Sequence, residues 1–95
     1  MLIKRKMYKL DIVPGAQRDL ARLARRIGRQ DFERLGQAIA ILAQDPRPVG
    51  VSKLQDRDNR YRIRVGSFRV IYEIYDGDSL VVIQEVGRRN EATYR

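Results

Sequence analysis

The chain has 95 residues, 20 of them lysine or arginine against 12 acidic residues, a formal net charge of +8, and neither cysteine nor histidine. A chain of this length forms one domain around one core. Without cysteine no disulfide or thiolate metal site is possible, and without histidine the commonest general base and metal ligand are missing. The positive excess indicates a polyanionic partner, which is RNA, DNA or an acidic protein; solubility with a coding bias toward arginine is the alternative explanation.

Arginine dominates the basic residues, with 16 arginines and 4 lysines. A guanidinium is a planar fork that binds phosphate through two hydrogen bonds and stacks on bases, whereas an ammonium is a hydrated point charge. The choice of arginine therefore favours a nucleic acid partner.

Neither a membrane span nor a secretory signal is visible in the sequence. No segment approaches the ~20 apolar residues of a span, and the N-terminus lacks the apolar core of a signal peptide. We therefore expect a cytoplasmic protein with one domain over residues 1–95, in which residues 1–6 are a dispensable leader if Met7 is the natural start.

The N-terminal segment is expected to form a strand and then a helix. Residues 7–13 alternate loosely and end at Pro14-Gly15, which indicates a strand followed by a turn. Over residues 16–27 the apolar side chains recur at helical spacing, so a helix is predicted there, with Gly28 as its C-cap.

A second helix is predicted over residues 31–44, with Asp31 near its start, where a carboxylate favours the helix dipole. The run that begins Asp45-Pro46 ends it. Because the two helices are joined by only a few residues, they should pack as an antiparallel hairpin.

The second half of the chain changes to a strand pattern. After a loop rich in proline, glycine and aspartate, apolar and polar residues alternate. We expect a loop over residues 46–59, strands over 61–65, 68–75 and 79–87, and turns at 66–67 and 76–78.

This order, β-α-α-β-β-β, predicts an α+β fold in which the helical hairpin packs on one face of a mainly antiparallel four-stranded sheet. Every second residue of a strand lies on the same face. The apolar set that should lie beneath the helices comprises Tyr61, Ile63, Val65, Val70, Tyr72 and Ile74. The opposite face is expected to be open.

Arg62, Arg64 and Arg69 should gather on that open face, because two strands joined at residues 66–67 bring them together. Cross-strand neighbours lie about 4.5–5.5 Å apart at Cβ. Guanidiniums this close repel one another unless an anion lies between them, which favours phosphate binding. The alternative is an ordinary solvated strand face, which Arg62 taken alone would fit.

Two segments resemble the RelE/ParE toxin superfamily. They read Y-R-I-R-V-G-S-F-R-V-I-Y-E-I over residues 61–74 and V-G-R-R-N-E-A-T-Y-R over residues 86–95. Lys53 ahead of the meander and the Asp-Pro end of the second predicted helix fit the same pattern. The resemblance covers nearly the whole chain from Met7.

The resemblance implies a RelE-like fold and the toxin of a type II toxin–antitoxin system. RelE-like members cleave messenger RNA in the ribosomal A site, where attack of a 2′-hydroxyl leaves a 2′,3′-cyclic phosphate; ParE-like members share the fold but inhibit DNA gyrase. Suitable residues at the RelE positions favour a metal-independent endoribonuclease without a cofactor. The implied partners are an acidic antitoxin, messenger RNA and the ribosome. A ParE-like, non-enzymatic gyrase inhibitor and a non-catalytic RNA-binding module remain alternatives.

The resemblance also implies the catalytic residues. Arg64 corresponds to a basic residue near the attacking 2′-hydroxyl, and Arg62 to its neighbour along the strand. Arg69 corresponds to the arginine that stabilises the phosphorane-like transition state, Arg89 to the basic residue near the leaving 5′-oxygen, and Tyr94 to the terminal aromatic that stacks on or orients RNA. Guanidiniums suit oxyanion stabilisation, and a tyrosine ring can stack on a base. Further RNA contacts are expected from Lys53, Arg60 and Arg88.

Two positions depart from the family pattern. Relatives often carry a lysine at one of the strand positions, and many carry a histidine where Arg88 stands. Arginine is a poor proton acceptor because its pKa exceeds about 12. The general base is therefore left unassigned, and in-line geometry with charge stabilisation is expected to supply most of the catalysis.

Overall fold

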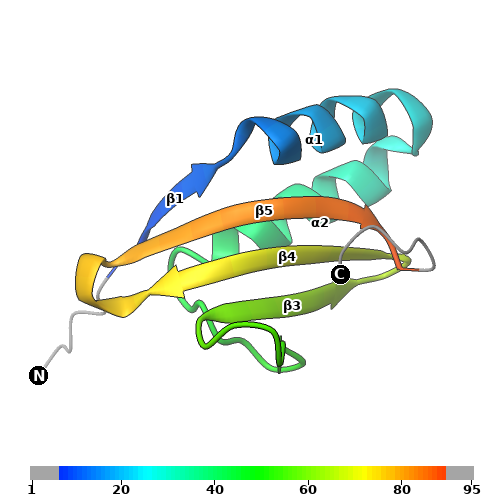
Figure 1. Cartoon of the computed structure of the whole chain (residues 1–95). Coiled ribbons are helices and arrows are strands. Elements are labelled where there is room, and N and C mark those ends of the chain that lie inside the picture. Colours follow the sequence, from blue (N-terminus) through cyan, green and yellow to red (C-terminus); the bar gives the residue numbers. More distant parts are fainter. Residues whose placement is uncertain (1–6, 90–95) are drawn as a thin grey trace, which may run out of the picture.

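A computed structural model of the chain describes residues 7–89, so the expected leader and Tyr94 lie outside the described residues. Five strands form one sheet in the order β1-β5-β4-β3-β2, and two helices lie on one face of it (Figure 1). The elements in chain order are β1 (Lys9–Ile12), α1 (Pro14–Arg26), α2 (Arg29–Ile41), β2 (Ser52–Lys53), β3 (Arg60–Val65), β4 (Phe68–Tyr75), the 3-10 turn η1 (Asp76–Asp78) and β5 (Leu80–Arg88).

The predicted α+β class is confirmed. Strands β3, β4 and β5 form the expected antiparallel meander, and β1 joins β5 in parallel. The helices run in opposite directions as a hairpin (Figure 1). One element was missed: the two-residue strand β2 lies within the predicted loop over 46–59 and pairs with the outer edge of β3. Two residues are too few to produce a visible alternation.

The predicted ends of the helices need correction. Pro14 is the first residue of α1 and is not part of a turn before it. Proline suits this position because the N–H groups of the first helical turn have no acceptor within the helix, and proline has no N–H. Gly28 is not a left-handed C-cap: its backbone is extended (φ −66°, ψ 156°) and it is the N-cap of α2, while Ile27 is the C-cap of α1. Helix α2 therefore starts earlier than expected, with Asp31 still in its first turn.

The core lies between the helices and the sheet. Strand β4, the middle strand, is buried from Phe68 to Ile74. The fully buried core side chains include Leu35, Leu42, Val70, Tyr72, Val81 and Ile83. This is the predicted apolar face, and it leaves the other face of β3 and β4 without a helix above it. That face is nevertheless not open along β4, because Arg69, Ile71 and Glu73 on it are buried.

A β-bulge in β5 changes which side chains face the core. Ile71 of β4 pairs with Glu85, but the next residue, Tyr72, pairs with Ile83. One residue of β5, Gln84, is therefore left over. Beyond this point the strand is shifted by one residue in phase, so that Val86 rather than Glu85 is buried beneath the helices.

The far end of the sheet, around η1, is tied by a polar cluster. Arg47 donates to both carboxylate oxygens of Asp76, at 3.3 and 2.9 Å, and its Nε donates to the Tyr61 hydroxyl at 3.3 Å. The Tyr8 hydroxyl donates to the same carboxylate at 2.6 Å, and this bond raises the pKa of Tyr8. The cluster joins the loop after α2 to the β4–β5 turn and to the residue before β1.

Replacement of Arg47 by alanine is expected to lower the free energy of unfolding by about 1 kcal/mol. The side chain is 43% exposed, so solvent screens most of the ion pair, and the lost hydrogen bonds account for the effect. Urea denaturation followed by circular dichroism measures it. Arg29→Ala is the control, since Arg29 is 91% exposed and pairs with the exposed Glu33 of its own helix. Equal urea midpoints for the two variants would show that the contacts of Arg47 do not stabilise the fold.

Candidate active site

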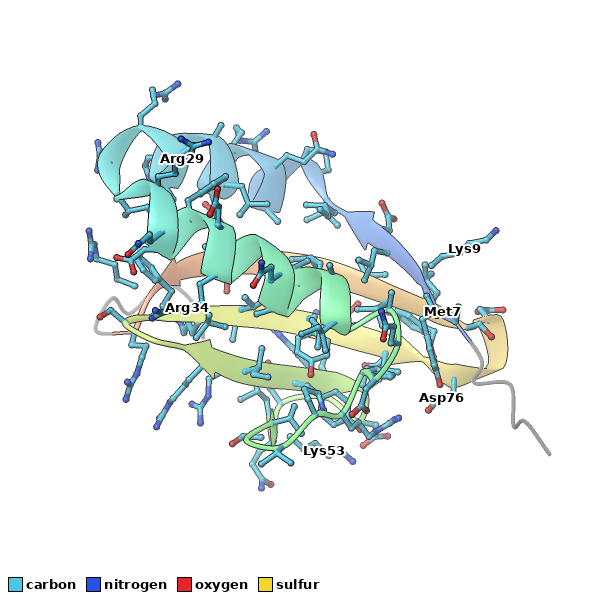
Figure 2. The ribbon with its side chains drawn as sticks, turned by 180° about the vertical axis from the view of Figure 1, so that it is seen from behind. Met7, Lys9, Arg29, Arg34, Lys53 and Asp76 are labelled. Carbon is cyan, nitrogen blue, oxygen red and sulfur yellow. The ribbon has the colours of Figure 1, made fainter. Side chains whose placement is uncertain are left out.

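The candidate site is the sheet face that the helices leave uncovered, at the end where β3 turns into β4. Across the strands, Arg64 pairs directly with Arg69, and Arg69 pairs with Gly87. The next row contains Arg62, Ile71 and Glu85. Paired residues of neighbouring strands point to the same face, so the expected gathering of Arg62, Arg64 and Arg69 is confirmed. We call this side of the sheet the arginine face. Nitrogen-tipped side chains extend from this end of β3 away from the helices (Figure 2).

The three arginines differ in exposure. Arg64 is exposed and Arg62 is half-buried, whereas Arg69 is only 2% exposed. Arg69 donates from Nη1 to the Arg88 carbonyl, and the residue opposite it, Gly87, has no side chain to block this path. Arg69 therefore fixes the end of β5, and with it the adjoining residue Arg89.

Arg89 lies beside the β3–β4 turn. Its backbone N–H donates to the Ser67 carbonyl at 2.8 Å, and its exposed guanidinium donates to the Gly66 carbonyl at 3.2 Å. Gly66 has a φ of +58°, the left-handed region that glycine adopts without strain, so this tight turn presents its carbonyl to Arg89. The structure thus brings Arg89 to the same end of the sheet as Arg64 and Arg69.

The other expected RNA contacts are more scattered. Arg88 pairs with Phe68 and so points to the helix side, with its guanidinium carbon 5.3 Å from the ring centroid. Lys53 pairs with Tyr61 and lies at the sheet edge on the helix side as well. Arg60 is on the arginine face, but its Nη1 donates to Oδ2 of Asp56 at 2.9 Å. The roles predicted for these three side chains stay predictions.

Arg34 of α2 was not found by sequence reasoning. Its guanidinium approaches Gly66, and Figure 2 places it beside this end of the sheet. A small hollow lies here between α2 and the turn, lined by Asp31, Arg34, Val65, Gly66, Ser67 and Phe68. An exposed arginine on an amphipathic helix carries no pattern that would have marked it.

Two carboxylates of β4 and β5 also lie on the arginine face, and Asp11 of β1 lies on it beyond β5. Glu73 is 4% exposed and accepts hydrogen bonds from Arg57 (2.9 Å), the Tyr75 hydroxyl (2.7 Å) and Gln84 (3.0 Å). Donors thus surround it on three sides. Glu85 has fewer partners: Arg60 reaches its Oε2 only at 3.8 Å, and that oxygen accepts no hydrogen bond within residues 7–89.

Burial raises the pKa of Glu85 above its ordinary value of 4.5. The neighbouring charges act in both directions. The guanidiniums of Arg60 and Arg69 lower this pKa, whereas the carboxylate of Asp19, on α1, raises it.

Comparison with known families decides what kind of protein carries this face. The family model of the ParE toxin of the type II toxin–antitoxin system, parDE, matches residues 10–93. The chain belongs to the RelE/ParE toxin superfamily. It is thus the toxin of a type II toxin–antitoxin system.

Two curated relatives of this toxin are RelE proteins. The chain is 33% identical to Toxin RelE of Mycobacterium tuberculosis over 88 residues, which cover 93% of this chain and 87% of the relative. It is 29% identical to the putative toxin RelE1 of Methanocaldococcus jannaschii over 65 residues, which cover 65% of this chain and 72% of the relative.

Solved structures show the same fold. The toxin is similar to the archaeal RelE–RelB complex of Pyrococcus horikoshii, with a TM-score of 0.74, 25% identity, and coverage of 90% of this chain and 99% of the other. For the DinJ–YafQ complex of E. coli the TM-score is 0.75 at 15% identity, with coverage of 93% and 99%. Within residues 7–89 of the toxin, neither helix is long and apolar enough to cross a membrane.

Proposed function

We propose that this toxin is a ribosome-dependent endoribonuclease that cleaves messenger RNA in the A site. The observation that carries the proposal is the direct cross-strand pair of Arg64 and Arg69 on the face free of helices, with Arg89 anchored beside it. The exposed guanidiniums of Arg64 and Arg89 can contact a single phosphodiester, with the charge of buried Arg69 behind them. The net charge of +8 attracts the polyanion to this face.

In the proposed reaction the 2′-hydroxyl of the substrate attacks the neighbouring phosphorus and the bond to the 5′-oxygen breaks, which leaves a 2′,3′-cyclic phosphate. Exposed Arg64 binds the non-bridging oxygens as negative charge develops on them. In this proposal Arg89 stabilises the leaving 5′-oxygen, and Tyr94 supplies the aromatic that stacks on a base. Because the nucleophile belongs to the substrate, no water has to be activated and no metal or cofactor is needed.

The structure changes the role that we propose for Arg69. Since it is almost completely buried and donates to the Arg88 carbonyl, Arg69 positions Arg89 as well as adding positive charge behind the phosphate. Its replacement therefore disturbs both the charge and the end of β5. Arg62, half-buried in the next row, extends the binding face along β3.

We further propose that an acidic antitoxin binds the toxin and covers the arginine face. The RelE structures of P. horikoshii and E. coli are described as complexes with RelB. A disordered acidic segment that folds on binding would neutralise the guanidiniums and exclude RNA from them.

The deciding experiment is primer extension on a translated messenger RNA after brief induction of the toxin. The intact chain is compared with a double variant, Arg64→Ala with Arg89→Ala, in which both replaced side chains are exposed and the core is untouched. New 5′ ends within coding sequence, absent from the double variant, are expected. Growth arrest without new ends would refute the nuclease.

Gyrase inhibition is the second candidate, because the matching family model is the ParE one. It predicts intact messages during growth arrest, and a toxicity that survives the loss of both arginines. Relaxed plasmid DNA, resolved on chloroquine gels from the same cultures, would identify it.

A further inference from the structure

The proposed nuclease lacks an identified proton acceptor. The chain contains no histidine, and arginine cannot accept a proton near neutral pH. The attacking 2′-hydroxyl must nevertheless lose its proton. Within the described residues, the strand register places the carboxylates of Glu73, Glu85 and Asp11 on the arginine face. Hydrogen-bond donors already surround Glu73, and Asp11 lies in the row of Glu73 on the outer strand β1, beyond β5 from the arginines of β3 and β4.

The bulge in β5 delivers Glu85 to this face. Strict alternation from Val81 and Ile83, both fully buried, would place Glu85 beneath the helices. The unpaired Gln84 shifts the phase, so that Glu85 joins the row of Arg62 and Ile71. Bulges of this kind are enriched next to active sites, where they redirect a side chain.

Glu85 is also near enough to serve the same phosphate. It lies one strand and two residues from Arg69, a separation of roughly 8 Å between Cα atoms at ordinary strand spacing. Its side chain remains 29% exposed, so a bound nucleotide can reach it.

The surrounding charges suit a proton acceptor. Arg60 of β3 and Arg69 of β4 act on the carboxylate with positive charge, and Asp19 of α1 acts on it with negative charge. Arg62 lies in the same row, on the far side of β4. Burial raises the pKa of Glu85, which makes its anion a stronger base than an exposed carboxylate. The flanking guanidiniums keep the ionised form populated.

We propose that Glu85 is the general base that removes the proton from the attacking 2′-hydroxyl. This inference rests on the proposed nuclease function. The Glu85 carboxylate takes the proton as the 2′-oxygen forms its bond to phosphorus, and the bond from phosphorus to the 5′-oxygen breaks. The leaving 5′-oxygen then takes a proton from water beside Arg89, and Glu85 returns its proton to solvent after release of the cyclic phosphate.

The test is single-turnover cleavage on ribosomes programmed with a synthetic messenger RNA, measured from pH 4.5 to 9. In the intact toxin the rate should rise with pH through the raised pKa of Glu85, because only the anion accepts a proton. Glu85→Gln should lower the rate roughly 100-fold and remove this rise. Glu85→Asp keeps a carboxylate and should retain the rise at a lower rate.

The control is Glu33→Gln, the same change at an exposed residue of α2, which should leave both the rate and the pH profile unchanged. A substrate with sulfur in place of the leaving 5′-oxygen separates the two proton transfers, because sulfur leaves without a proton. The defect of Glu85→Gln should persist on that substrate.

Three results would overturn the assignment. The first is a Glu85→Gln rate equal to that of the intact toxin, and the second is a reduced rate with the pH rise retained. The third is restoration of the rate by the sulfur substrate, which would make Glu85 the acid. In each of these the intact toxin still cleaves, so the proposed function stands. A failure of the proposed function is distinct: the intact toxin itself then makes no cuts.

Discussion

Arg64→Ala is expected to slow messenger RNA cleavage by roughly 100-fold to 1,000-fold, the effect of removing one donor from a transition-state anion. Arg64 is exposed and supports no described part of the core, so the loss should appear in the rate and not in the stability. Single-turnover cleavage on programmed ribosomes measures it. Arg64→Lys keeps the charge but not the fork, and should recover only part of the rate.

The matched control is Arg29→Ala, which removes one positive charge from the first residue of α2, remote from the arginine face. If binding depends only on net charge, both alanine variants will lose the same amount and will show the same dependence on salt. If the local geometry matters, only the Arg64 variant will be impaired. An Arg64 variant as active as the Arg29 variant contradicts the proposed site.

Tyr72→Ala is expected to lower the free energy of unfolding by about 3–5 kcal/mol. Tyr72 is completely buried on the central strand, its ring stacks on Tyr61 with centroids 6.0 Å apart, and its hydroxyl donates to the Pro46 carbonyl at 2.7 Å. Since a domain of this size has a total stability of roughly 5–14 kcal/mol, the variant should be close to unfolding at 37 °C.

Tyr72→Phe separates the ring from the hydroxyl. It keeps the packing but leaves the Pro46 carbonyl without this donor, at a cost of about 1–3 kcal/mol. Burial raises the pKa of Tyr72, so the hydroxyl stays protonated and keeps donating through neutral pH. Urea titration of both variants gives the two values. A phenylalanine variant as unstable as the alanine variant would contradict this division.

The arginine face was predictable because it depends on local rules. Apolar and charged residues alternate over residues 61–65, and the two-residue turn at Gly66 sets the register, so Arg64 has to lie opposite Arg69. The helical hairpin followed from apolar spacing in the same way. Only its ends were misjudged, at Pro14 and Gly28, where one residue can serve either a turn or a helix cap.

The exposure of each arginine could not be predicted from the alternation. Arg64 and Arg69 share a face and a register row, yet one is exposed and the other is buried against the end of β5. Arg88 and Arg89 are adjacent in the sequence but diverge, one packed over Phe68 and the other bonded to the turn. These differences depend on which strand is central and where the last strand ends.

The sequence by itself determined the α+β class, the basic face and the resemblance to the toxin superfamily, because strand period, turn residues and charge are local properties. The tertiary structure alone decided that Glu85 faces the arginines. Ile83 and Val86 of β5 are both buried beneath the helices although they lie three residues apart, an odd spacing that regular alternation does not allow. The bulge between them lets both side chains face the core. That odd spacing is visible in the sequence, but only the partner strand β4 shows which residue is left over.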